Sequence, residues 1–144
     1  MINTVTPIRR LMPLGDPEGG NFEYTVEGLP ETLFACTVPV TDMARAVGFY
    51  TEVLGMRVLG EGPEETFLVR GDCRIVLRRR EDAGVDTGIF LGVDSPYNTR
   101  RRLIDEGVRF PSDPARGPMG TSVSFYDSEG NTLTAIETGA EFRP

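Results

Sequence analysis

The amino-acid sequence predicts an α+β fold built from two βαβββ modules in tandem. The same order of strand, helix and strand signals occurs in each half of the chain. Gly55 and Gly107 occupy equivalent places at the ends of the two expected helices. The 144 residues are 39% hydrophobic and 26% charged, which is typical of one globular domain.

The first module begins with an apolar strand at 33–40, where Pro39 favours an edge or terminal position. Thr41 and Asp42 then supply an N-cap for a helix that Gly55 ends. The apolar residues of this helix recur at helical spacing: Met43, Ala46, Val47, Tyr50 and Leu54. Strands are expected at 56–59, 65–70 and 73–80, with turns at 60–63 and 70–72.

The second module repeats this order. A strand is expected at 88–93, followed by a helix that Ser95 caps, with Pro96 at its first position and Gly107 at its end. Further strands are expected at 108–110, 121–126 and 131–137, and residues 127–130 form the last hairpin turn, in which Gly130 and Asn131 permit a positive φ.

The residues before the first module differ in composition. Prolines and glycines interrupt residues 1–31, although Phe22, Tyr24 and Val26 alternate with polar residues. This N-terminal arm is a flexible segment, an added strand, or an arm exchanged with a partner. A single domain is then expected over 32–140, with modules at about 33–80 and 87–137, followed by a tail at 141–144.

Composition excludes several functions. The sequence has no histidine, so Ser-His-Asp and Cys-His catalysis and imidazole metal sites are impossible. Its 15 basic residues, all arginine, and 22 acidic residues give a net charge of −7, which argues against nucleic acid and favours a cationic ligand. Two cysteines make no disulfide framework, and no apolar run approaches the about 20 residues of a membrane span. We expect a cytoplasmic protein with no membrane contact.

Several motifs resemble the vicinal-oxygen-chelate superfamily, which includes glyoxalases, bleomycin-resistance proteins and extradiol dioxygenases. They are Val40-Thr-Asp42, Ala46-Val-Gly-Phe-Tyr50 and Leu54-Gly55 in the first module, and Phe125-Tyr-Asp127 and Glu129-Gly-Asn131 in the second. Ser128 replaces a proline that is usual in the family. The resemblance implies a curved, barrel-like mixed sheet with a concave cleft, and it says more about fold than about function.

Enzymes of this family usually hold a divalent metal in the cleft. Counting from the motifs places the ligand positions at Ala35, Val76, Thr87 and Thr134. These side chains carry neither imidazole nor carboxylate, which metal sites of the family require. We therefore expect no metal and no other cofactor, and glyoxalase or dioxygenase chemistry in its metal-dependent form is disfavoured.

Alternate residues of a strand face the same side, so the neighbours of these positions define the expected lining of the cleft. Thr37 follows Ala35, and Arg74 precedes Val76, where its guanidinium either grips an anion or remains solvated. Tyr126 reaches either the cleft or the core. The expected ligand-binding residues are Ala35, Thr37, Arg74, Val76, Thr87, Tyr126 and Thr134. Arg79 and Arg80 are interpreted as a solvated strand end, and Cys36 and Cys73 as packing residues.

Three functions are compatible with this lining. The first is metal-independent binding of a small organic molecule, similar to the bleomycin-resistance members, with sequestration of a drug or metabolite. The second is a metal-free isomerase, cyclase or lyase, which would need an acid or base with a shifted pKa. The third is an interaction module. In each case we expect a homodimer.

Overall fold

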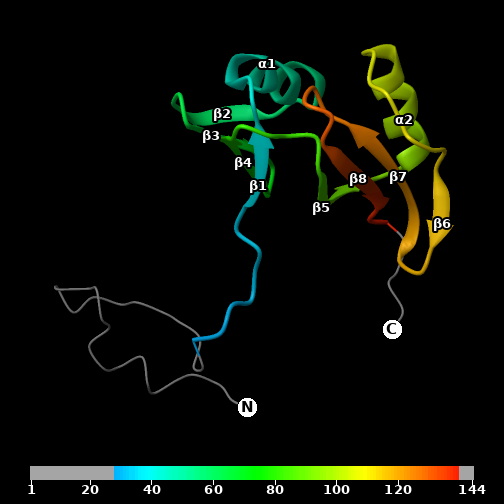
Figure 1. Cartoon of the computed structure of the whole chain (residues 1–144). Helices are drawn as coiled ribbons and strands as arrows, with labels where there is room; N and C mark the ends of the chain where they lie inside the picture. The colour runs from blue at the N-terminus through cyan, green and yellow to red at the C-terminus, as the bar shows by residue number, and fades with distance from the viewer. Residues whose placement is uncertain (1–27, 140–144) are drawn as a thin grey trace. The chain divides into compact units, whose positions relative to one another are not determined.

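The computed structural model describes residues 28–139, and all strands and helices lie in a compact unit that begins at Phe34 (Figure 1). The expected strand around Phe22, Tyr24 and Val26 and the tail at 141–144 lie outside the described residues. No helix among the described residues is long and apolar enough to span a membrane.

The first module forms a four-stranded sheet with strand order β1-β4-β3-β2. Strand β1 runs parallel to β4, and the other neighbours are antiparallel. Its elements are β1 Cys36–Val40, α1 Met43–Gly48, η2 Phe49–Val53, β2 Arg57–Glu61, β3 Glu65–Arg70 and β4 Cys73–Arg79.

The second module forms a sheet of the same topology, with strand order β5-β8-β7-β6. Its elements are β5 Asp86–Val93, α2 Pro96–Asp105, β6 Ala115–Gly117, β7 Gly120–Tyr126 and β8 Thr132–Glu137. The predicted α+β class and tandem βαβββ order are confirmed. The strands of the described residues make two separate curved sheets and not one closed barrel (Figure 1).

One predicted strand is wrong. Residues 108–110 form no strand, and the equivalent place in the second sheet is taken by β6 at Ala115–Gly117. Phe110 packs against the core instead, with its ring centroid 6.2 Å from that of Phe125. All three residues of β6 are exposed, so no alternation of apolar and polar residues marks this strand in the sequence.

The helix boundaries follow their capping residues. Asp42 accepts a hydrogen bond from the backbone N–H of Arg45 at 3.1 Å, and Ser95 accepts one from Asn98 at 3.2 Å. Gly55, with φ of 74°, follows the first helical segment. That segment is not uniformly α-helical as expected, because it continues as the π-helical turn η2, in which Leu54 N–H bonds to the Phe49 carbonyl.

A network of buried polar groups joins the two modules at the hairpin turn between β7 and β8. The Asn131 side chain donates to the Pro39 carbonyl at 2.8 Å and accepts from the backbone of Gly84 and Val85. It also donates to Asp127 at 3.0 Å. Asn131 is fully buried, so every one of these bonds replaces a bond to water.

The same turn reaches the first helix. Tyr50 is fully buried and donates its hydroxyl hydrogen to the Asp127 carboxylate at 2.7 Å. Glu129 accepts from the backbone N–H and hydroxyl of Thr41 and from the backbone N–H of Asp42. The motif residues Thr41, Asp42, Tyr50, Asp127, Glu129 and Asn131 therefore connect one module to the other by hydrogen bonds.

Replacing Asn131 by alanine should remove about 3 kcal/mol from the free energy of unfolding, because it leaves several buried donors and acceptors unpaired. Urea denaturation followed by circular dichroism measures this change. Asn98→Ala, at the exposed start of α2, is the matched control and should change it by less than about 0.5 kcal/mol. Equal effects of the two variants would contradict the role given to Asn131.

Burial and the neighbouring Asp127 carboxylate raise the pKa of Tyr50 far above its ordinary value. The folded state therefore keeps Tyr50 protonated while the unfolded chain ionises it, so this contribution to stability is complete below about pH 10 and is lost as the pH rises. Ultraviolet titration should show one tyrosine that ionises only as the protein unfolds. Tyr50→Phe should abolish that delayed phase, and its persistence would refute the assignment.

Candidate functional site

The face of the first sheet that lies opposite the core, called here the open face, carries side chains in three cross-strand rows. The strand register places Thr37, Val76 and Phe67 in the middle row. One row pairs Glu65 with Arg78, and the other pairs Val69 with Arg74. These side chains are half-buried or exposed, whereas the alternate residues of the same strands form the core.

A groove of about 380 Å³ lies on this open face, and we call it the Phe67 groove. Three large apolar side chains at the groove remain uncovered: Phe34 is 72% exposed, Leu59 56% and Phe67 44%. Contiguous apolar surface of this kind is typical of a binding site. The lining residues are Phe34, Ala35, Leu59, Gly60, Phe67, Leu68, Arg74, Ile75 and Val76.

Arg74 is held at the edge of the groove by Phe34. Its guanidinium carbon lies 4.6 Å from the centre of the Phe34 ring, and its Nη1 donates to the Phe34 carbonyl at 3.5 Å. Within residues 28–139, no carboxylate forms an ion pair with Arg74. Among the contacts within these residues, the guanidinium keeps most of its hydrogen-bond donors available.

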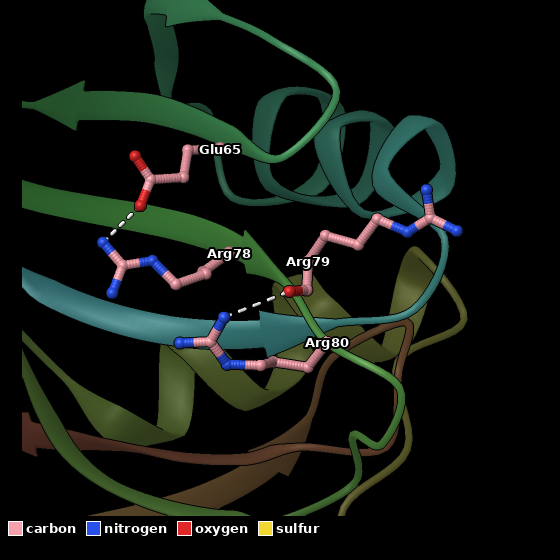
Figure 2. A network of polar contacts seen from close by, with 4 residues as sticks. All are labelled: Glu65, Arg78, Arg79 and Arg80. Atoms are coloured by element: carbon pink, nitrogen blue, oxygen red, sulfur yellow. Dashed lines mark hydrogen bonds and ion pairs between the residues drawn. The ribbon is translucent and has the colours of Figure 1, made fainter.

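A second hollow, of about 700 Å³, lies beside the groove at the end of β4 and shares Gly60 and Phe67 with it. Here Arg78 forms an ion pair with Glu65, while Arg79 extends in a different direction from Arg78 (Figure 2). Arg80 donates to the Arg79 carbonyl at 3.2 Å. The lining combines three arginines with Glu61, Glu64 and Glu65, so its formal charges balance.

The structure places the predicted binding residues in three locations. Ala35, Arg74 and Val76 line the Phe67 groove, and Thr37 lies next to Val76 in the sheet register. Thr87, Thr134 and Tyr126 belong to the second sheet and do not line this groove.

Thr87 and Thr134 both belong to the second sheet, where their hydroxyls are engaged. Thr87 donates to the Thr132 carbonyl at 2.7 Å and accepts from the N–H of Ile89 at 3.1 Å. These bonds lie where the β5–β8 register shifts between Asp86 and Phe90. The hydroxyls of Thr134 and Ser124 are 2.9 Å apart and bond to each other. Both threonines therefore have structural partners.

Tyr126 lies at the end of β7 in a small polar pocket of about 230 Å³, away from the lining of the Phe67 groove. The guanidinium carbon of Arg109 lies 5.2 Å from the centre of its ring. Arg45 and Ser128 line the same pocket.

The side chains at the four positions where the family resemblance implies metal ligands do not suit a metal ion. Ala35 and Val76 carry no donor atom, and the hydroxyls of Thr87 and Thr134 are committed as described. Over residues 28–139, no three Cys, Asp or Glu side chains gather as a possible metal centre. Hard cations need several oxygen ligands, which this set does not supply.

The two cysteines pack at the margin of the core, half-buried and free of disulfide bonds. Burial, with a smaller contribution from Cys36, raises the pKa of the Cys73 thiol. Cys73 is therefore protonated near neutral pH and is a weak nucleophile.

Sequence reasoning missed Phe34, Leu59 and Phe67. Phe67 had a usable signal, because the two-residue turn at Gly71 and Asp72 pairs Arg70 with Cys73 and so sets Phe67 opposite Val76. Leu59 had none, because it lies at an irregularity between Val58 and Gly60 that shifts the β2–β3 register.

The fold and its motifs define the class of protein. Residues 32–134 match the Glyoxalase/Bleomycin resistance protein/Dioxygenase superfamily, and the chain belongs to this family. No curated protein sequence matches at a significant level.

Several solved structures share the fold of this chain. An antibiotic binding protein, TnmS3 from Streptomyces sp. CB03234, is 24% identical with a TM-score of 0.66, over 75% of this chain and 96% of its own. The bleomycin-binding protein of Streptomyces verticillus, complexed with copper(II)-bleomycin, is 19% identical with a TM-score of 0.65, over 76% and 99%. Lactoylglutathione lyase from Agrobacterium tumefaciens is 19% identical with a TM-score of 0.66, over 77% and 96%. Binding proteins and an enzyme are therefore equally similar in fold.

The Glu65–Arg78 ion pair should contribute little to stability. Both side chains are more than a third exposed, so water and salt screen their attraction. Glu65→Gln should change the free energy of unfolding by less than about 1 kcal/mol, and the change should shrink in high salt. Urea denaturation at low and high ionic strength measures both effects. A larger, salt-independent loss would mean that Glu65 has a packing role.

Proposed function

We propose that this protein binds a small, largely apolar organic molecule in the Phe67 groove, without a metal, and sequesters it unchanged. The observation that carries the proposal is the groove itself, a hollow of about 380 Å³ at which Phe34, Leu59 and Phe67 are exposed. A volume of this size is within the range of ligand pockets in proteins.

The chemistry of the lining favours binding over catalysis. The described residues that line the groove include no Asp, Glu, Tyr or Cys, so none supplies an acid or base of suitable pKa. The one ionisable residue of this lining is Arg74, whose guanidinium donates hydrogen bonds and accepts none. The names of two similar structures, an antibiotic binding protein and a bleomycin-binding protein, support the same role.

The proposal includes a homodimer. The open face of the first sheet exposes Leu59 and Phe67, and β5 of the second sheet exposes Phe90 by 55%. A second copy of the chain would shield part of this apolar surface, which a monomer leaves in water. Native mass spectrometry of the purified protein reports the number of chains directly.

Binding is tested with N-phenyl-naphthylamine, an uncharged aromatic probe whose fluorescence rises in apolar surroundings. The protein should bind it saturably, with one site per chain. Val76→Trp fills the groove and should weaken binding at least tenfold. Val85→Trp, at an exposed position outside the groove lining, is the matched control and should bind normally. Circular dichroism verifies that both variants are folded.

Absence of saturable binding to the folded wild-type protein would refute the proposal, as would equal binding by the two tryptophan variants. Recovery of small molecules that copurify with the protein then separates sequestration from catalysis. Mass spectrometry should find the same compound before and after prolonged incubation, whereas its conversion would show an enzyme.

A further inference from the structure

The two arginines of β4 that lie on the open face of the first sheet, Arg74 and Arg78, have different electrostatic settings. Arg74 and Arg78 are four residues apart on β4, so both side chains face the same side, about 13 Å apart along the strand. Across the ladder from Arg78 is Glu65, which forms an ion pair with it. Across the ladder from Arg74 is Val69, which offers no charge.

The other residues that line the groove are also uncharged. Ala35, the residue before β1, lines the same groove as Arg74 and carries no charge. The aromatic ring of Phe34 covers the guanidinium, and its carbonyl accepts one hydrogen bond. Within the described residues, Arg74 is thus a positive charge at the edge of an apolar groove that contacts Phe34 and forms no ion pair with a carboxylate.

A guanidinium beside apolar surface is suited to a carboxylate or sulfonate on an aromatic ligand. It presents parallel donors to two anion oxygens, and its prior ordering by Phe34 lowers the entropic cost of binding. The net charge of −7 acts over long distances and is screened by salt, whereas a direct contact with Arg74 is short-ranged. Local charge therefore outweighs net charge in selecting the ligand.

We propose that the ligand of the Phe67 groove is an aromatic anion, whose acidic group binds Arg74 while its rings lie on Val76, Phe67 and Leu59. This inference rests on the proposed function and adds the chemical class of the ligand. It replaces the cation favoured by net charge with an anion favoured by the residues of the groove.

The test compares two probes that share one ring system. Anilinonaphthalene sulfonate carries a sulfonate, and N-phenyl-naphthylamine does not. Wild-type protein should bind the sulfonate more tightly. Arg74→Gln should weaken sulfonate binding about tenfold more than it weakens binding of the neutral probe, because one charge-assisted contact is lost only with the sulfonate. Arg74→Lys should retain part of the preference.

Arg102→Gln removes an exposed arginine of α2 that lies outside the groove lining, and it is the control for net charge. It should alter neither affinity. If the neutral probe binds but the sulfonate gains nothing, or if Arg74→Gln weakens both probes equally, the aromatic anion is refuted and the proposed function stands. If neither probe binds the folded protein, both proposals fail.

Discussion

The structure depends on the buried polar network around Asp127 and Asn131. These two side chains lie in one hairpin turn, yet their partners come from β1, from the segment before β5 and from the first helical segment. Hydrophobic contacts alone would leave the modules free to slide, because burial of apolar surface is not directional. Hydrogen bonds in a buried site fix one arrangement, since any other arrangement leaves donors and acceptors unpaired. The two modules are thus held together by these side-chain hydrogen bonds, and their sheets remain separate.

This arrangement separates the residues that maintain the fold from those available for function. In the first sheet, the core occupies the side that faces the helix, and the open face contributes little to the core or to the network. The side chains of the open face can consequently change without loss of the fold. Such freedom explains how the same architecture accommodates binding proteins and an enzyme.

The sequence predicted most of the fold because the fold follows local rules. Caps at Asp42 and Ser95, the glycine at position 55 and alternation along the strands are visible without tertiary information. It did not predict β6, whose residues are all exposed, or the π-helical turn η2. For the site, it anticipated Ala35, Arg74 and Val76 but not their neighbours from β2 and β3. Those neighbours follow from hairpin register, which depends on turns and bulges and is only partly encoded by residue type.

The irregularity at Leu59 gives the groove a property of its own. Between Val58, which pairs with Leu68, and Gly60, which pairs with Phe67, the second strand contains one residue more than its partner. Leu59 is that residue, and it lines the groove without belonging to the ladder. Deleting Leu59 would restore a regular β2–β3 ladder and remove one part of the groove lining. Inserting a further residue would enlarge the irregularity. The shape of the groove therefore depends on the length of this strand and not only on the side chains that it carries.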